Sequence, residues 1–356
     1  VDIIIELIGG AEGTAKKLVF NALKNKKHVV TANKALISKY GDELSRIAEK
    51  NKVNLEYEAA VCGGVPIIRS IKEGLIANKI SRIYGIFNGT SNYVLSSMDK
   101  NKTSFNTTIQ KAINLGYAEA NPSSDINGDD VAAKVKILSC LSFNSFLNQN
   151  IHVEGIKEID EEDILNANLL GYKIKLMGFS EILSNKIYQR VHPTLVKKTS
   201  YIASVNGVLN AVIVDGKPVG KNIIQGEGAG PSATTSALVS DVSSIMRGNI
   251  KFPFAISNIK RKKYTSGKIT DLFFSSYIRL NVKDKYGVLS DVTKIFSNNK
   301  VSIKRVLQSP QKNKINSSIV IITHRSKDKN IQKTLKTLVK KSYIIKRPKL
   351  IRIEND

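Results

Sequence analysis

The sequence predicts an α/β protein in three parts. Short apolar segments alternate with helical ones at the start of the chain, which is the pattern of a doubly wound parallel sheet. The middle of the chain mixes longer helical segments with strand-like runs, which is typical of an α+β domain with a sheet. The last part follows the order β-α-β-β-α-β, which predicts a ferredoxin-like unit. A length of 356 residues is enough for two or three domains, because a domain usually holds ~100–200 residues.

The first part begins with a continuous apolar run at 1–8 that ends in Gly9 and Gly10. A run of β-branched residues followed by two glycines predicts a buried parallel strand and a tight turn. The segments that follow predict a helix, a strand, a helix and a strand, at 11–25, 27–31, 40–51 and 53–60. This is an incomplete Rossmann-type nucleotide domain, because no GxGxxG follows an early strand. Since a βαβ unit takes ~30 or more residues, we expect roughly two further units upstream of Val1.

The remaining segments set the predicted domain boundaries. In the middle part, helices are predicted at 65–78, 92–99, 105–115 and 129–141, and strands at 80–87, 187–196 and 211–214. A glycine-rich turn at 226–230 and a helix at 232–246 are predicted to return to the nucleotide domain. We therefore expect a nucleotide domain at 1–62 completed by 220–256, a substrate and dimerisation domain at 63–219, a polar, basic linker at 257–276 and the C-terminal unit at 277–356.

The C-terminal unit restarts the alternation of strands and helices. Strands are predicted at 277–282, 301–308, 315–323 and 343–353, and helices at 287–298 and 331–340.

Composition excludes several classes of protein. No apolar run reaches the ~18 residues of a membrane span, and no basic segment precedes the apolar start, as a signal peptide would require. The two cysteines belong to no CxxC pair, which favours a reducing, cytoplasmic location over a disulfide or zinc framework. The net charge of +25 could indicate a nucleic-acid partner, but the lysines are spread along the chain without interleaved aromatic residues. We therefore expect neither a nucleic-acid nor a membrane partner.

The strongest candidate site is the segment 116–134, a polar loop that leads into a helix near Asp129. Asp130 and Lys134 are four residues apart, so they share one face of that helix. An amino-acid substrate needs carboxylates for its ammonium group, and carbonyl reduction needs a proton donor. A lysine can be that donor if burial lowers its pKa toward neutrality. The alternative is a capped helix, with Asn127 or Asp129 as the cap, that carries a surface ion pair.

Three other segments carry weaker signals. Lys34 follows a predicted strand, where ligands of open α/β sheets collect, although it could equally be a surface lysine. The turn at 88–92 offers backbone N–H groups or is an ordinary helix start capped by Thr90 or Ser91. The glycine turn at 58–66 could hold a monovalent cation with its carbonyls or be a plain β–α turn.

At this point the motifs resemble a known family. The segments ELIGG, TANKALI, EAAVCGGVPII, GIFNGTSNYVL, GYAEANPSSDINGDDVAAK and GEGAGPSATTSALVSD are similar to those of homoserine dehydrogenase, in the same order. The resemblance implies reduction of aspartate 4-semialdehyde to homoserine with NADPH or NADH, on the route to threonine and methionine. It also implies a homodimer or tetramer with the central sheet at the interface.

The resemblance assigns roles to individual residues. It makes Lys134 the proton donor and Lys34 a catalytic and cofactor-binding neighbour of the nicotinamide. For substrate binding it implies Glu119, Asp130, Asp125 and Tyr117; for close approach to the cofactor it implies Gly9, Gly116, Glu119, Gly228 and Gly230; and for a monovalent cation, Na⁺ or K⁺, it implies Glu58, Val61, Gly63 and Val65. Asn121 departs from the family, which usually has aspartate there.

The C-terminal unit resembles an ACT domain, because Asp284 to Leu289 matches its D-x-x-G-V-L turn. The resemblance implies that Asp284 and Gly287 lie at a regulatory amino-acid site, with threonine as the expected effector. The missing glycine loop leaves an alternative open, in which the chain is a non-catalytic remnant that acts as an amino-acid-binding regulatory subunit.

Overall fold

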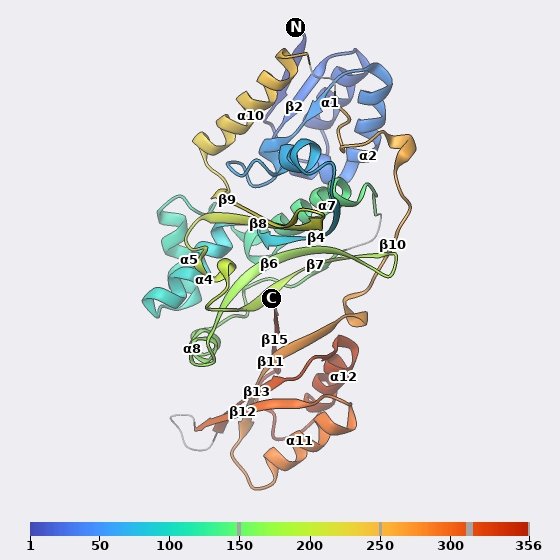
Figure 1. Cartoon of the computed structure of the whole chain (residues 1–356). Helices are drawn as coiled ribbons and strands as arrows, with labels where there is room; N and C mark the ends of the chain where they lie inside the picture. Colours follow the sequence, from blue (N-terminus) through green and yellow to red (C-terminus); the bar gives the residue numbers. More distant parts are fainter. Residues whose placement is uncertain (148–150, 249–250, 311–315, 355–356) are drawn as a thin grey trace.

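The computed structural model describes residues 1–147, 151–248, 251–310 and 316–354, and it has three stacked parts (Figure 1). The N-terminal layer lies at the top of this view, the central sheet in the middle and the C-terminal unit at the bottom. No helix in these described ranges is long and apolar enough to cross a membrane.

The N-terminal layer contains three parallel strands in the order β1-β2-β3. The strands are β1 (Ile3–Glu6), β2 (His28–Thr31) and β3 (Leu55–Glu56), and the connecting helices are α1 (Thr14–Lys24) and α2 (Lys34–Asn51). A later helix, α10 (Pro231–Met246), returns to this layer, and its Leu238 and Ile245 pack against Val30. The predicted parallel α/β layer is therefore confirmed.

Two predicted elements at the border between this layer and the central part differ from the structure. The third strand is shorter than expected, because the chain turns into the 3₁₀ segment η1 (Glu58–Ala60). The single helix predicted at 65–78 is instead a short α3 (Ile67–Arg69) followed by the π-helical segment η2 (Ser70–Gly74). The Leu75 N–H bonds to the Ser70 carbonyl at 2.7 Å, and this i→i+5 bond is the widened turn of a π-helix.

The central sheet runs β7-β6-β4-β8-β9 and continues through β15 into the C-terminal unit. Its strands are β4 (Lys79–Ile86), β6 (Tyr172–Leu183), β7 (Lys186–Lys197), β8 (Leu209–Lys217) and β9 (Gly220–Glu227). Two of them were not predicted. β6 is buried on both faces along most of its length and therefore lacks alternation, whereas β9 is largely exposed and polar. Because β9 pairs with β8, the expectation that the chain returns to the nucleotide domain at residue 220 is wrong, and the return begins with α10.

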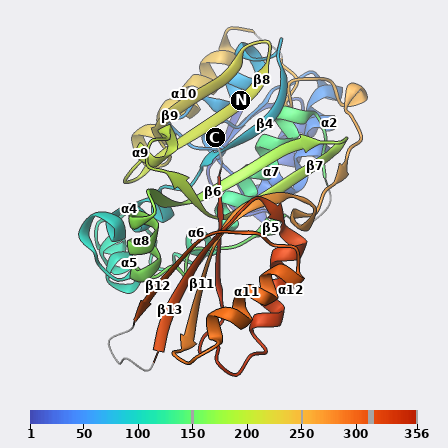
Figure 2. The ribbon, with the colours of Figure 1, turned by 60° about the horizontal axis from the view of Figure 1, so that its bottom comes forward.

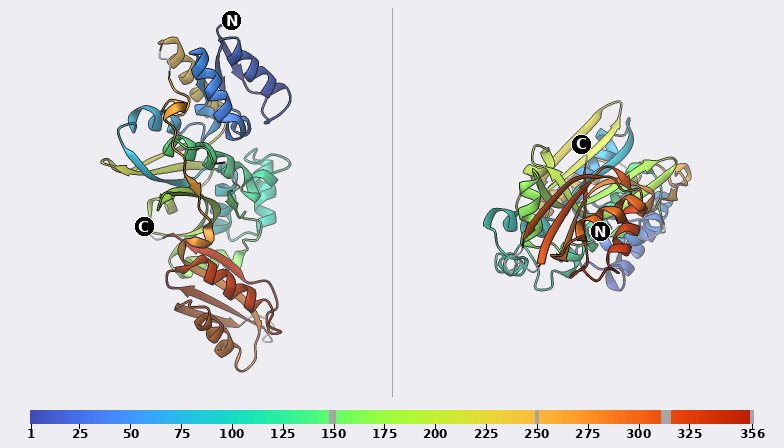
Figure 3. Two further views of the ribbon diagram at one scale, coloured as in Figure 1. Left: turned by 90° about the vertical axis from the view of Figure 1, so that its right-hand side faces the viewer. Right: turned by 90° about the horizontal axis from the view of Figure 1, so that it is seen from below.

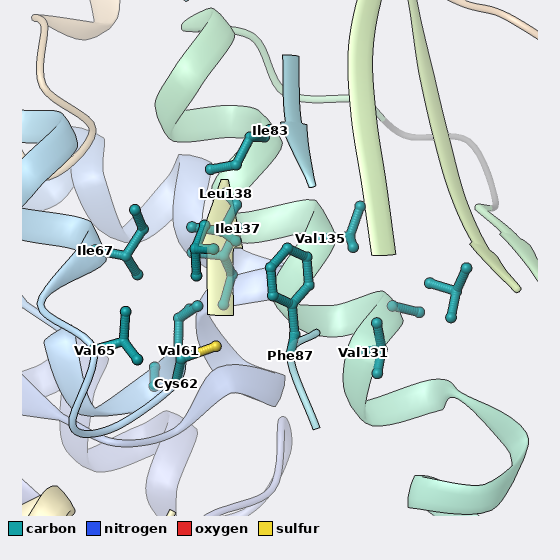
Figure 4. Close-up of a cluster of buried hydrophobic side chains, with 14 of the residues drawn as sticks. Val61, Cys62, Val65, Ile67, Ile83, Phe87, Val131, Val135, Ile137 and Leu138 are labelled. Carbon is teal, nitrogen blue, oxygen red and sulfur yellow. The ribbon is translucent and has the colours of Figure 1, made fainter. Parts of the chain in front are cut away.

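The described residues of the central part also form the helices α4 (Gly89–Asn101), α5 (Phe105–Asn114), α6 (Ser123–Asn127), α7 (Asp129–Phe143), α8 (Glu161–Leu169) and α9 (Tyr201–Ser204). Helix α7 lies between the N-terminal layer and the sheet and is buried almost all round. Figure 4 shows its Val131 and Leu138 in one cluster with Phe87, from the end of β4, and with Val61. Burial on every side explains why α7 has no polar stripe.

The segment 257–276 was predicted to be a linker, and it is fastened to the body at several points. It contains η3 (Asn258–Lys260), β10 (Thr265–Ser266), which pairs with β7, and η4 (Ile269–Asp271). The buried Arg261 guanidinium pairs with Asp42 at 2.5 Å and with Glu49 at 3.1 Å, both on α2.

The C-terminal unit has the predicted ferredoxin-like order. Its elements are β11 (Phe273–Lys283), α11 (Val288–Asn298), β12 (Ile303–Pro310), β13 (Asn316–Thr323), β14 (Ser326–Lys327), α12 (Asp328–Leu338) and β15 (Lys349–Ile353). Both helices cover one face of the sheet (Figures 2 and 3). The other face contributes Tyr277 and Ile351 to the main core, and β15 pairs in parallel with β7, so the two sheets are continuous. β5 (His152–Val153) also pairs with β7.

Candidate active site

Lys134 is the centre of the candidate site and lies one turn after Asp130 on α7. Its ammonium nitrogen is 2.8 Å from Asp130 Oδ2 and donates a 2.7 Å hydrogen bond to the Phe87 carbonyl. Lys134 and Asp130 are only 7% and 5% exposed. The prediction that they share one helix face is confirmed, and the alternative of a surface ion pair is excluded by this burial.

Lys34, which belongs to the N-terminal layer, contacts the same carboxylate. Its ammonium nitrogen lies 3.0 Å from Asp130 Oδ1, and its side chain is 42% exposed. The helix was predicted to begin near residue 40, but α2 begins at Lys34 because the Asn33 side chain caps it, accepting from the Leu36 N–H at 3.0 Å. The cap therefore fixes the start of α2 and aims Lys34 at α7.

Asn88 joins the acidic residues of the site and was not assigned to it from the sequence. Its amide nitrogen donates to Asp125 at 2.8 Å and to Asp130 at 2.9 Å, while its oxygen accepts from the Ser91 N–H. Asn88 is therefore the cap of α4, and the assignment of that role to Thr90 or Ser91 is wrong. The sequence signal that could have found it is an asparagine directly after a buried strand.

The start of α7 also differs from the prediction. Neither Asn127 nor Asp129 caps it; Gly128 precedes it with a φ of 90°, a conformation that favours glycine. The loop predicted at 116–128 contains the short helix α6, and Asp125 lies on it. The tight turn at Gly128 lets α6 and α7 follow each other closely, so that Asp125 and Asp130 both reach Asn88.

The electrostatics of the cluster are dominated by one carboxylate between two ammonium groups. Burial alone would raise the pKa of Asp130, but Lys134 and Lys34 outweigh it and hold that pKa well below its ordinary value. Burial alone would lower the pKa of Lys134, but Asp130 outweighs it and the pKa is raised. The condition stated for Lys134 as a proton donor, a pKa that burial lowers toward neutrality, is therefore not met. Burial and the charge on Asp130 raise the pKa of Asp125.

The other predicted substrate residues lie at the edge of this cluster. Tyr117 is 44% exposed and its ring lies 5.0 Å from the Tyr93 ring, while its carbonyl accepts a 2.7 Å bond from Thr90. Glu119 is exposed and makes no hydrogen bond or ion pair within the described ranges. Gly116 is also exposed and lies where this loop begins, just after the end of α5. The structure thus brings Lys34, Asp125, Asp130 and Lys134 together and leaves Glu119 outside their contacts.

Gly9 lies at the carboxyl end of β1, beside the start of α2. It has a φ of 81°, and open space lies where a Cβ would point. The Asn33 amide donates to the Gly10 carbonyl at 2.7 Å, which holds this turn next to the cap of α2 and hence next to Lys34. An open glycine turn beside Lys34 fits the close approach of a nicotinamide cofactor.

Two further glycine turns, one at Gly63 and Gly64 and one at 226–230, pack against each other. The Gly64 N–H donates to the Glu227 carbonyl at 2.9 Å, and a Cβ on Gly228 would lie only 2.2 Å from the Asn210 side chain. Gly230 ends this turn as the residue before α10. The turn that contains Gly63 is thus packed directly against the turn that contains Gly228.

The predicted cation ligands fit a cation in part. The Glu58 carboxylate is already used, because its two oxygens accept from the Ile68 and Arg69 N–H groups at 2.8 Å each. Burial raises the pKa of Glu58 to about 7. In contrast, the side-chain amide of the fully buried Asn210 makes no hydrogen bond to nitrogen or oxygen in the described part of the chain. This amide lies beside Gly228, which packs against Gly63, and an amide oxygen without a partner suits a hard cation.

The predicted regulatory turn borders a hollow in the C-terminal unit. A cavity of about 340 Å³ is lined by Gly287, Asp291 and Tyr343, among others. The Tyr343 hydroxyl donates to Asp291 at 2.9 Å, and Lys341 pairs with Asp291 at 2.8 Å. Asp284 is exposed and does not line this hollow.

Comparison with known proteins places this geometry in a family. A family model for homoserine dehydrogenase matches residues 66–243, its NAD-binding domain model matches 1–58 and an ACT domain model matches 276–341. The homoserine dehydrogenase of Neisseria gonorrhoeae is 38% identical over the whole chain and 83% of its own length, and that of Bacillus subtilis is 38% identical over 95% of the chain and 78% of its length.

Solved structures agree with these relatives. The crystal structure of a homoserine dehydrogenase from Thiobacillus denitrificans matches with a TM-score of 0.93 and 38% identity, over all of this chain and 82% of the other. A hyperthermophilic archaeal homoserine dehydrogenase solved with NADPH matches with a TM-score of 0.62 and 29% identity, over 70% of this chain and 73% of the other. None of these relatives supports a non-catalytic regulatory subunit. With the lysine–aspartate cluster inside the matched central segment, the chain belongs to the homoserine dehydrogenase family, a family of oxidoreductases with an NAD-binding domain.

Proposed function

We propose that this chain reduces L-aspartate 4-semialdehyde to L-homoserine with NADPH or NADH, with Lys134 as the proton donor. The observation that carries the proposal is the buried Lys134 ammonium, held by Asp130 at 2.8 Å in a cluster that also includes Lys34 from the N-terminal layer. Such a cluster places a positive charge and a transferable proton where the two layers meet. Both are what a carbonyl oxygen needs as it becomes an alkoxide.

The raised pKa of Lys134 suits the direction of reduction. The ammonium stays protonated at neutral pH, so it stabilises the developing negative charge on the aldehyde oxygen and then gives its proton to that oxygen. An alkoxide is a far stronger base than an amine, so this transfer is downhill even with a raised pKa. The products are the alcohol and a neutral lysine, which regains a proton from solvent.

The surrounding residues position the substrate. Asp130 keeps Lys134 charged and, with Glu119 at the exposed side, attracts the ammonium group of the substrate. Asp125 adds negative charge through Asn88, and Tyr117 lines the entrance beside Tyr93. Lys34 lies on the side of the N-terminal layer, where it polarises the carbonyl and contacts the cofactor.

A bound NADPH or NADH supplies the hydride. Gly9, Gly116, Gly228 and Gly230 are proposed to let its surface approach the backbone closely, and Lys34 and Glu119 to border it. The open space above Gly9 supports this assignment. We further propose that Na⁺ or K⁺ binds at Glu58, Val61, Gly63 and Val65 through backbone carbonyls, which the orphaned Asn210 amide supports.

Regulation and assembly complete the proposal. The hollow beside Gly287 is proposed to bind threonine, with Asp284 at its turn, and a homodimer or tetramer is proposed as the working form. The ACT domain match supports an amino-acid effector.

The test is the variant Lys134→Met of this protein, with Lys136→Met on the same helix as a matched control. Loss of the general acid is expected to lower the kcat of reduction by about 10²- to 10⁴-fold, while cofactor binding measured by fluorescence of NADPH is retained. The control should keep its turnover, because Lys136 is outside the cluster. Turnover near the wild-type rate in Lys134→Met would remove Lys134 from the mechanism.

A further inference from the structure

A cavity of about 210 Å³ lies where the C-terminal unit meets the central sheet, far along the sheet from Lys134. It is formed by side chains of β4, β6 and β7 on one side and by the start of β11 and the end of β15 on the other. Figure 1 shows β15 reaching up from the C-terminal unit to β6 and β7. We propose that this junction cavity binds a small molecule with one carboxylate group and a short apolar part.

The charges that line the junction cavity do not balance. Arg82, Arg190 and Arg325 contribute three guanidinium groups, and Glu181 and Glu354 contribute two carboxylates, which leaves one positive charge in excess. Arg82 Nη2 lies 3.0 Å from both oxygens of Glu354, and Arg190 pairs with Glu181 at 2.5 Å. A ligand with a single negative charge would neutralise the cavity.

The same guanidinium groups keep unused donors. Arg190 is 2% exposed and its Nε has no hydrogen-bond partner among the described residues; the buried Nε of Arg82 likewise makes no hydrogen bond there, although Glu181 Oε2 is 3.4 Å away. A buried donor without a partner costs about 1–3 kcal/mol. Arg190 cannot turn to water to recover this loss, because its guanidinium carbon lies 4.4 Å from the Phe179 ring centroid and 5.4 Å from that of Phe274.

The size and the rim of the cavity limit further which ligands can bind. Sites for drug-sized ligands are about 300–1,000 Å³, so the junction cavity suits a molecule smaller than these and excludes a nucleotide. Leu183 and Phe273 line it and are 45% and 53% exposed, so they offer apolar surface to a short hydrocarbon part. Guanidinium groups, which bind carboxylates bidentately, then face the other end of the ligand.

Because of the position of the cavity, a ligand bound there would connect the C-terminal unit to the central sheet. Arg352 and Ile353 of β15 pair with Thr194 and Leu195 of β7, and the Glu354 N–H bonds to the Leu195 carbonyl at 2.9 Å. A ligand held by Arg190 of β7 and Arg325 of the C-terminal unit would add a further link across this seam. The site does not depend on the proposed catalytic function, because none of its residues contacts the Lys134 cluster.

The test is isothermal titration of the full chain with propionate and, as a cation of similar size, propylammonium. Propionate is expected to bind saturably and propylammonium is not. Arg325→Ala removes an exposed guanidinium whose only described bond is a 3.4 Å contact to the Phe273 carbonyl, and Leu183→Glu places a negative charge at the rim. Each variant is expected to weaken propionate binding about tenfold or more, because Arg325→Ala removes one charged hydrogen bond and Leu183→Glu repels the carboxylate.

Two controls locate the binding. Arg347→Ala removes an exposed arginine elsewhere in the C-terminal unit, and Asp284→Ala alters the turn beside the other hollow, so both should bind propionate as the wild type does. No saturable propionate binding, or unchanged affinity in both Arg325→Ala and Leu183→Glu, would overturn the proposal.

Discussion

Lys134 and Lys175 are both buried in the central part of this protein, and their surroundings shift their pKa values in opposite directions. Lys134, on α7, contacts the Asp130 carboxylate, and its pKa is raised. Lys175, on β6, is 1% exposed, and burial lowers its pKa to about 7, with Lys173 adding to the effect. Burial is similar at the two positions, so the charge of the partner decides the sign of the shift.

The partners of Lys175 are all neutral oxygens. Its ammonium nitrogen lies 2.5 Å from the Val205 carbonyl, 3.0 Å from Asn92 Oδ1 and 3.2 Å from Asn206 Oδ1. These bonds tie β6 to α4 and to the turn before β8, but they supply no negative charge. The comparison teaches that a buried lysine stays protonated above neutral pH where the fold also buries a carboxylate beside it.

Removing the Asp130 carboxylate should lower the pKa of Lys134, as burial lowers that of Lys175. This is the largest effect expected from the comparison. In Asp130→Asn the pKa of Lys134 falls, because burial then acts against only the Phe87 carbonyl and smaller effects such as that of Asp125. The rate of reduction should then decline above the new pKa, by about tenfold for each pH unit, while the wild-type rate is not limited by loss of this proton in the neutral range. The measurement is the pH profile of kcat for reduction in both proteins.

A matched change separates this effect from a general loss of the site. Asp129→Asn alters the neighbouring exposed acid on the same turn of α7 and should leave the profile unchanged. Asp130→Asn is also expected to cost stability, about 3–5 kcal/mol, since it leaves a buried ammonium without its counter-ion. A profile that stays parallel to the wild type across neutral and alkaline pH would show that Asp130 does not set the protonation of Lys134.

The second prediction concerns the stability of the protein rather than its activity. The folded pKa of Lys175, about 7, lies below its unfolded value near 10.5, so the unfolded chain binds more protons between these pH values. Lys175 therefore makes the free energy of unfolding rise with pH across this window, by at most about 1.4 kcal/mol per pH unit. Lys175→Met removes the contribution, so the wild type should gain stability relative to the variant as the pH rises from 7 to 10.

Denaturant unfolding at several pH values measures this slope. Lys186→Met is the control, because it removes an exposed lysine at the start of the neighbouring strand β7. That variant should keep the wild-type slope. If Lys175→Met also keeps the slope, Lys175 is charged in the folded protein and the contrast with Lys134 is lost.

The sequence predicted the regular parts of the fold because their patterns are local. The alternating strands and helices of the first and last parts are confirmed, and so is the helical face shared by Asp130 and Lys134. It missed β6 and β9, since a strand buried on both faces and a strand exposed along most of its length both lack alternation. The split of the helix after Pro66 could not be predicted, because the Glu58 carboxylate that takes two of its N–H groups precedes it by several residues.

The site was predictable in its residues and less so in its electrostatics. Motifs identified Lys34, Asp125, Asp130 and Lys134, and the structure brings them together. The direction of the Lys134 pKa depended on whether Asp130 would be buried with it, and helical spacing cannot distinguish a buried pair from a surface pair. Asn88 was overlooked because its role depends on two acids more than thirty residues later in the chain.

The smallest effect is expected where the charge is exposed, at Glu119. An exposed charge contributes about 1 kcal/mol or less, so Glu119→Gln should raise the KM for homoserine by about fivefold at most and leave kcat nearly unchanged. This sets a scale for the comparison, because the same loss of one negative charge at the buried Asp130 is expected to change kcat and its pH dependence. Initial rates over a range of homoserine concentrations measure the effect, with Glu158→Gln, in the chain segment before α8, as a control. An unchanged KM together with weaker cofactor binding would assign Glu119 to the cofactor instead, and a fall in kcat as large as that of Asp130→Asn would show that Glu119 enters the buried cluster when substrate binds.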